Sequence, residues 1–263
     1  MHIPVIFEDE YLLAINKPPF VVVNRAESVK GETVQDWVEE RNRGHVPSPR
    51  AQAEGTGDKD AMRESRIDSE NQEENTTEFM SRAGIVHRID KETSGILLIA
   101  KNADVFEDLQ RQFKERLIKK VYLAIVHGRV TPSVGEVSVP VGRLPWNRER
   151  FGIVPGGKPA VTKFICLKSI VDARIGDTVS VLEVYPETGR THQIRVHMKY
   201  INHPIVGDYL YAGRKVAKKD RRSISRVLLH AWKLTCTHPV TGKNLHIEAP
   251  IPDDMIESIN GSL

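Results

Sequence analysis

The 263-residue chain has few cysteines, few aromatic residues and no long hydrophobic run. Its two cysteines, Cys166 and Cys236, lie far apart, and aromatic residues make up 6% of the sequence. Two isolated cysteines cannot build the disulfide framework of a small secreted protein, so we expect free thiols and a cytoplasmic location. No run reaches the roughly 18 apolar residues of a membrane span. The first residues lack the basic segment of a signal peptide. A membrane protein or a secreted protein is therefore excluded.

Positive charge is present, but it is unevenly distributed. The net charge is +3, whereas residues 45–80 hold nine acidic and four basic residues, a net of −5. The remainder therefore carries +8. A basic folded part suits a polyanionic partner such as RNA, because each neutralised phosphate releases condensed counterions.

One segment differs in composition from the rest. Residues 43–81 contain few large apolar residues and much Gly, Pro, Ser, Asn and Glu. Such a segment cannot bury enough apolar surface to offset the entropy lost on ordering. We therefore expect a single domain, residues 1–263, with a polar insertion at 43–81 that a short Gly-Ser bridge could replace.

Short apolar runs separated by turn residues dominate the other parts of the chain. They predict a strand–turn–strand unit at 5–23 and a turn-rich stretch at 128–160, with strands at 121–126, 161–167, 179–184, 228–236 and 245–248. Because strands outnumber helices and follow one another, we expect an α+β fold, with a mixed, mainly antiparallel β-sheet core and flanking helices.

Two stretches have helical character. Val105, Leu109, Phe113 and Leu117 recur every four residues and predict a helix over 104–119, with Asp104 and Glu107 as its capping box. A second helix is expected at 191–200.

The stretch from Arg82 to Asn102, RAGIVHRIDKETSGILLIAKN, places a charged loop between two apolar runs. Arg88 precedes Asp90 by two residues, and Thr93-Ser94-Gly95 favours a tight turn. This layout suits a carboxylate held by hydroxyl and backbone donors, with a cation nearby. The protein-kinase H-R-D loop is excluded, because Ile89 separates Arg88 from Asp90 and no Gly-rich phosphate loop precedes them.

A second polar stretch, ETGRTHQIRVHMKY, spans residues 187–200. Arg195 permits two interpretations: a surface ion pair of little energetic value, or a guanidinium directed at a buried carboxylate. His192 and His197 are five residues apart, which is not one helical turn. No third ligand stands beside them, so we expect no metal site.

These stretches closely resemble the H-R-L-D-x-x-T-S-G and G-R-T-H-Q-I-R-V-H motifs of the RluA-type pseudouridine synthases, with Ile89 in place of Leu. The resemblance extends from Phe7 to Ile259 apart from the insertion. It includes Lys17-Pro18 and the element KVYLA at 120–124. It is greatest to the RluC/RluD branch, whose N-terminal S4-like domain we do not expect here, because the first motif begins at residue 7.

The resemblance implies an isomerase, an RNA pseudouridine synthase that converts uridine to pseudouridine in structured RNA, with large-subunit rRNA favoured over tRNA. It implies a monomer that needs no cofactor, metal or membrane. Asp90 would be the catalytic aspartate, Arg195 its partner, and Tyr122 would lie against the target base. The expected substrate-binding residues are His87, Arg88, Thr93, Arg190, His192 and Leu229. For the RNA backbone we expect Lys17, Arg214, Lys218, Lys219, Arg221 and Arg222.

Two other functions remain open from the residues. A non-catalytic RNA-binding protein would share the basic surface but would not need Asp90. A glycoside hydrolase would need a second positioned carboxylate, for which Glu92 and Glu187 are candidates by residue type.

Overall fold

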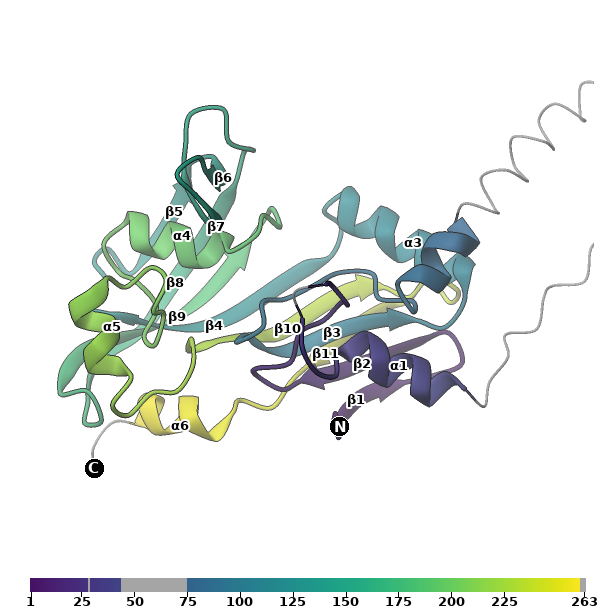
Figure 1. Ribbon diagram of the computed structural model, residues 1–263, viewed down its shortest axis with the longest axis horizontal. Coiled ribbons are helices and arrows are strands. Elements are labelled where there is room, and N and C mark those ends of the chain that lie inside the picture. Colours follow the sequence, from purple (N-terminus) through teal and green to yellow (C-terminus); the bar gives the residue numbers. More distant parts are fainter. Residues whose placement is uncertain (28, 44–74, 261–263) are drawn as a thin grey trace, which may run out of the picture.

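The computed structural model describes residues 1–27, 29–43 and 75–260. In this part of the chain nine strands form one sheet in the order β1-β2-β3-β10-β4-β9-β8-β5, with β11 paired to β10. Every described pairing in the sheet is antiparallel except β3 with β10. The sheet runs the length of an elongated molecule with helices on both faces (Figure 1). The predicted α+β class with a mixed, mainly antiparallel sheet is therefore confirmed.

The elements follow one another along the chain with short connections. The strands are β1 (Val5–Glu8), β2 (Leu12–Lys17), β3 (Ser94–Ala100), β4 (Lys119–His127), β5 (Val134–Ser138), β6 (Val141–Leu144), β7 (Asn147–Ile153), β8 (Val161–Asp172), β9 (Asp177–Pro186), β10 (Leu229–Thr237) and β11 (Asn244–Glu248). The helices are α1 (Val34–Asn42), α3 (Ala103–Lys114), α4 (Gln193–Tyr200), α5 (Arg214–Asp220) and α6 (Asp253–Asn260). Within the described ranges, no helix combines the length and the apolar character that crossing a membrane requires.

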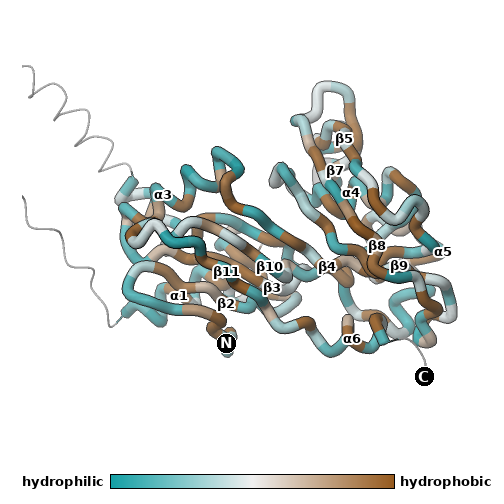
Figure 2. The backbone as a smooth tube through the Cα atoms, turned by 180° about the vertical axis from the view of Figure 1, so that it is seen from behind, coloured by the Kyte–Doolittle hydropathy of each residue, from teal (hydrophilic) through white to brown (hydrophobic). Residues whose placement is uncertain are grey.

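Alternation along the strands decides which helix covers which face of the sheet, because successive side chains point to opposite sides. In β2, Leu12 packs in the same core cluster as Phe106 of α3, whereas Leu13 packs with Val38 of α1. The apolar residues that recur along the central strands form these cores (Figure 2).

The same rule places α4 on the face that α3 covers. In β4, Ala124 packs with Met198 of α4, whereas Leu123 faces the cluster beneath α6. Lys120 shares the side of Ala124 and pairs with Leu234, which packs in the α3 cluster. Helices α3 and α4 therefore cover one face, at opposite ends of the sheet (Figure 1).

Two local predictions were wrong. Helix α3 begins one residue earlier than expected, because Asn102 is its N-cap and accepts a hydrogen bond from the backbone N–H of Val105 at 2.9 Å; the Asp104–Glu107 capping box does not form this cap. The helix also ends at Lys114, so Leu117 does not extend the apolar stripe and is 53% exposed. The stretch 128–160, expected to be turns, contains β5, β6 and β7.

Most of the predicted insertion, residues 44–74, lies outside the described residues. Residues 75–81 are helical. Phe79 is 8% exposed and packs edge-on against Phe106 of α3, with ring centroids 5.9 Å apart. The last residues of the predicted segment therefore belong to the folded part.

We predict that a short Gly-Ser bridge in place of residues 44–74 leaves the melting temperature within a few degrees of the wild type, on the ground of composition alone. The matched change Phe79→Ala removes a buried ring and should cost roughly 3–5 kcal/mol of unfolding free energy. Thermal and denaturant unfolding of both variants measure this. A bridged protein as unstable as Phe79→Ala would show that the segment packs.

His230 makes stability sensitive to acid. It is fully buried in β10, and its Nδ1 lies 2.9 Å from the hydroxyl of Ser94 at the start of β3. Burial, reinforced by the charge of Arg226, lowers the pKa of His230 to about 4. An unfolded histidine titrates near pH 6.5. The neutral imidazole therefore contributes stability above about pH 6.5 that is lost as the pH falls toward 4.

We accordingly predict that His230→Gln flattens the pH dependence of unfolding, by at most about 1.4 kcal/mol per pH unit between pH 6.5 and 4. Denaturant unfolding of both proteins across this range tests it. Equal slopes for the variant and the wild type would contradict the prediction.

Candidate active site

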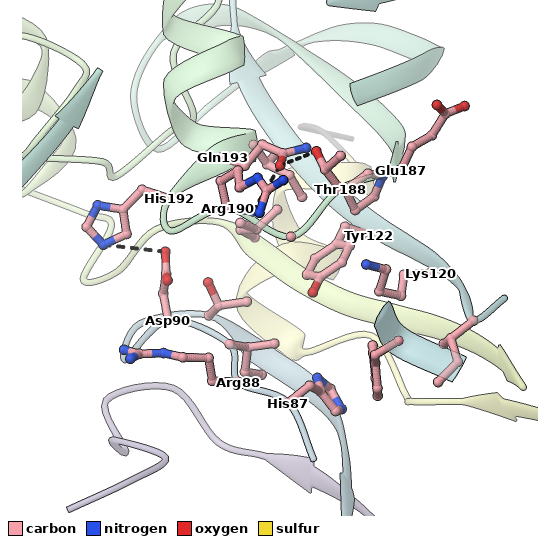
Figure 3. Close-up of a pocket in the computed structure, with 18 of the residues that line it drawn as sticks. His87, Arg88, Asp90, Lys120, Tyr122, Glu187, Thr188, Arg190, His192 and Gln193 are labelled. Atoms are coloured by element: carbon pink, nitrogen blue, oxygen red, sulfur yellow. Dashed lines mark hydrogen bonds and ion pairs between the residues drawn. The ribbon is translucent and has the colours of Figure 1, made fainter. Parts of the chain in front are cut away.

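A cavity of about 530 Å³ opens on the face of the sheet that α3 and α4 share. Its walls come from the loop before β3, the first half of β4, the end of α3 and the beginning of α4. It brings together every residue predicted to be catalytic or to bind the substrate base: His87, Arg88, Asp90, Thr93, Tyr122, Arg190, His192, Arg195 and Leu229. Most of these side chains converge in Figure 3.

The loop that carries Asp90 is held at its end by Gly95. The backbone N–H of Thr93 donates to the carbonyl of Asp90 at 3.1 Å and closes the turn. Gly95 has a φ of +112°, and a Cβ there would lie 2.2 Å from the carbonyl oxygen of Ala231. Glycine is therefore required for the parallel contact of β3 with β10, which fixes where the loop ends.

Lys17 holds the loop from beneath. Its ammonium donates to the carbonyls of Pro18 at 2.8 Å, Val21 at 2.9 Å and Lys91 at 3.1 Å. The side chain is fully buried, and burial lowers its pKa to about 7. The prediction that Lys17 contacts the RNA backbone was wrong, because the ammonium is enclosed by protein carbonyls that no phosphate can displace without disrupting the loop.

Arg195 joins two carboxylates at the centre of the site. Its Nη1 lies 3.0 Å from Oδ2 of Asp90, which confirms the predicted contact. Its Nε and Nη2 lie 2.7 and 3.0 Å from the two carboxylate oxygens of Asp208. Asp208 is fully buried and Arg195 is 5% exposed. The ring of Tyr211 lies 5.1 Å from the guanidinium carbon. The guanidinium is thus fixed in one orientation.

The two carboxylates determine the charge of this arginine. Burial alone would lower the pKa of Arg195, but hydrogen bonds and attraction from Asp208, followed by Asp90, outweigh burial and raise the pKa. A permanent positive charge therefore lies against Asp90. Sequence reasoning missed Asp208. The available signal was that it is the only acidic residue between Glu187 and Asp220.

His192 approaches Asp90 from the other side. Its Nε2 lies 3.8 Å from Oδ2 of Asp90 (Figure 3), and its Nδ1 lies 2.8 Å from the hydroxyl of Tyr211. Burial lowers the pKa of His192, although the charge of Asp90 opposes the effect. The imidazole is therefore neutral near pH 7. Because the Tyr211 oxygen also accepts the N–H of Phe151 at 3.1 Å, its position is fixed.

Tyr122 extends into the cavity from β4, between Asp90 and Lys120 in the view of Figure 3. Burial raises the pKa of its hydroxyl, and the negative charge of Asp90 adds to the effect. The phenol therefore stays protonated at any physiological pH. It can donate a hydrogen bond or a proton, and its ring offers a flat apolar surface.

The remaining predicted residues form the walls. His87 accepts a hydrogen bond from the backbone N–H of Leu98 at 2.9 Å, and its ring lies 4.6 Å from that of Phe113. Burial lowers the pKa of His87 to about 3, so this imidazole is a neutral wall. Arg88 is exposed at the rim, and Arg190 donates to the carbonyl of Pro159 at 3.1 Å.

The basic residues near α5 lie elsewhere. Lys219 pairs with Asp177 at 2.5 Å, and the guanidinium of Arg221 lies 4.4 Å from the ring centroid of Tyr209. The exposed side chains of Arg214, Lys218, Lys219, Arg221 and Arg222 do not line the described cavity. Instead the cavity wall includes four cations that sequence reasoning did not select: Arg82, Lys114, Arg116 and Lys120.

Comparison with known proteins places this site in a family. The sequence profile described as RNA pseudouridylate synthase matches residues 11–200. Ribosomal large subunit pseudouridine synthase D of Neisseria meningitidis serogroup B is 42% identical over 181 residues, which cover 66% of this chain and 46% of that protein. Uncharacterized RNA pseudouridine synthase YjbO of Bacillus subtilis is 34% identical over 257 residues, covering 98% and 75%.

Solved structures give the same result. Human RNA Pseudouridylate Synthase Domain Containing 1 is 26% identical and superimposes with a TM-score of 0.67, over 95% of this chain and 83% of that one. The chain spans about half the length of several curated relatives that it matches. A profile match over most of the chain, together with these relatives, shows that the chain belongs to the RNA pseudouridylate synthase family.

Proposed function

We propose that this protein is an RNA pseudouridine synthase that isomerises specific uridines in structured RNA, with large-subunit ribosomal RNA as the favoured substrate. The observation that carries the proposal is the carboxylate of Asp90, held at 3.0 Å by Arg195 inside a cavity that Tyr122 also lines. The relative from Neisseria named for the large ribosomal subunit supports the choice of RNA.

The reaction is a rearrangement within one nucleotide. The bond between the ribose C1′ and the uracil nitrogen breaks, the uracil turns, and a new bond forms between C1′ and C5. The proton on C5 is then lost and the ring nitrogen gains one, so atoms and charge balance without a cofactor. A base in a helix must first be extruded, at a cost of a few kcal/mol.

Each central side chain has a task in this scheme. Asp90 acts at the ribose, either by attacking C1′ or by removing the 2′ proton; both roles use the carboxylate that Arg195 orients. Tyr122 lies against the uracil and, as a protonated phenol, exchanges protons with it. Neutral His192 faces Asp90 without competing for its charge, because it carries none near pH 7.

The alternatives fit the geometry less well. Glu187 is ion-paired with exposed Lys163, and Glu92 accepts the backbone N–H of Val227 instead of lining the described cavity. Neither supplies the second positioned carboxylate of a glycoside hydrolase. A purely RNA-binding protein would gain nothing from Asp90, since a carboxylate at the centre of the cavity repels phosphate.

Several finer assignments complete the proposal. We assign Arg88 and Arg190 to the substrate and the exposed basic residues of α5 to an outer RNA surface; tRNA is the second choice of substrate. Cys166 and Cys236 are both free, which suits a reducing compartment such as the cytoplasm. A monomer satisfies the site, because all its described residues come from one chain.

We predict that Asp90→Asn and Asp90→Ala abolish activity, lowering turnover roughly a thousandfold or more, because the group that acts at the ribose is lost. Release of tritium from RNA labelled at C5 of uridine measures the reaction directly. RNA affinity and melting temperature should change little. The matched change Asp253→Asn, at an exposed carboxylate outside the cavity, should leave turnover at the wild-type level. Turnover of Asp90→Ala within about tenfold of the wild type would refute the assignment.

For Arg195 we expect Arg195→Ala to lower turnover by roughly a hundredfold or more, because a fixed charge beside Asp90 disappears. Arg195→Lys should restore only part, since an ammonium cannot bind both oxygens of Asp208 and reach Asp90 as well. Asp208→Asn, which keeps the arginine but weakens its anchor, should fall between the wild type and Arg195→Ala. Full activity of Arg195→Lys in the same tritium assay would show that the planar fork is not needed.

A further inference from the structure

The wall of the cavity at the end of α3 carries positive charge that neither the fold nor the proposed chemistry explains. Lys114 ends α3, Arg116 follows it, and Lys120 lies in the second position of β4. All three line the cavity. We call these three residues the α3–β4 corner. Figure 3 shows Lys120 on the opposite side of Tyr122 from Asp90.

No carboxylate neutralises this corner within the ranges that the structure describes. The acidic residues that line the cavity are engaged elsewhere: Asp90 pairs with Arg195 and Glu187 with Lys163. The ammonium of Lys120 is directed only at the ring of Phe113, 6.0 Å from its centroid. Positive charge is thus concentrated in the wall without a counter-charge.

The position of Lys120 adds to the cost of this arrangement. Its side chain is half-buried, and burial followed by repulsion from Arg116 lowers its pKa. An amine that stays partly desolvated beside another cation is unfavourable in the empty site. An anion bound between the two would offset both effects.

Arg116 also reduces the stability of the backbone. It has a φ of +61°, in the left-handed region that glycine or asparagine normally occupies at the end of a helix. The turn is closed by the backbone N–H of Leu117, which donates to the carbonyl of Gln112 at 2.9 Å. Glycine would make this turn with less strain. An arginine at such a position indicates a use for its side chain.

We propose that the α3–β4 corner is a phosphate-binding subsite, which holds a backbone phosphate of a nucleotide adjacent to the uridine that enters beside Asp90. This inference rests on the proposed function and adds to it the direction in which the RNA strand leaves the cavity. Phosphates are the anionic groups of RNA, and lysine and arginine are their usual partners. Once the target base lies between Asp90 and Tyr122, a neighbouring phosphate is the group that can satisfy the corner.

The test uses the full chain with Arg116→Gly, Lys120→Met and the double variant. Arg116→Gly removes a charge and backbone strain together, so its melting temperature should equal or exceed that of the wild type. Lys120→Met removes the charge while keeping an unbranched side chain of similar size. The probe is an unmodified transcript of large-subunit ribosomal RNA. Its dissociation constant is measured from about 50 to 300 mM salt.

We expect the double variant to bind about tenfold more weakly near physiological salt, and the slope of log K against log salt to become shallower by about one to two. Arg116→Lys should recover part of the lost affinity. Two controls are matched to the two effects. Lys243→Gln removes an exposed charge outside the cavity, and Asn202→Gly relieves another left-handed residue, with φ +63°, without removing charge. Both should bind like the wild type.

The outcomes separate this inference from the function on which it rests. A double variant with wild-type affinity and slope overturns the subsite, as does an equal loss in Lys243→Gln. Suppose that the wild type releases no tritium from labelled RNA, but the corner variants lose affinity and slope. The subsite then holds and only the activity assignment fails. Tritium release by the wild type with unchanged binding by the corner variants would reject the subsite alone.

Discussion

The site depends on one buried ion-pair network, Asp208–Arg195–Asp90. Removing three charged groups from water is expensive, and the cost is recovered only when all partners are present with good geometry. Here the guanidinium uses three of its nitrogens on two carboxylates, and Asp208 also accepts backbone N–H groups of Leu210 and Tyr211. The network therefore ties the loop before β3, the helix α4 and the turn at residue 208 to one arrangement. Any part that shifts leaves an uncompensated charge.

The cavity exists because two helices on one face do not meet. Alternation in β4 assigns Lys120, Tyr122 and Ala124 to the same side of the sheet. Met198 of α4 covers the level of Ala124, and the cluster beneath α3 covers Leu234 of β10. Between them Tyr122 and Lys120 remain in the open wall. The sheet thus supplies a firm floor, and each helix contributes one terminus to the rim.

Sequence reasoning succeeded where a short motif contained the chemistry and failed where a contact joined distant segments. Asp90 and Arg195 could be paired from their motifs, and the alternation of apolar residues was enough for the strands. Asp208 carries no motif, and only the folded chain places it against Arg195. Lys17 was wrong for a related reason: lysine is normally exposed, and its burial follows from three carbonyls of the loop. The corner at Arg116 depends on where α3 ends, which an unexpected left-handed residue decides.

The parallel pairing of β3 with β10 also governs how the molecule is made. His230 and Ala231 pair with Ser94 and Gly95, positions separated by 136 residues in the case of His230 and Ser94. During synthesis, β1, β2 and β3 leave the ribosome long before β10, so the inner edge of β3 waits with unpaired backbone groups. An intermediate of this kind is open to aggregation or to capture by chaperones. Closure of the sheet by β10 removes that edge and completes the wall around Asp90 in one event, so a chain halted before residue 229 lacks both.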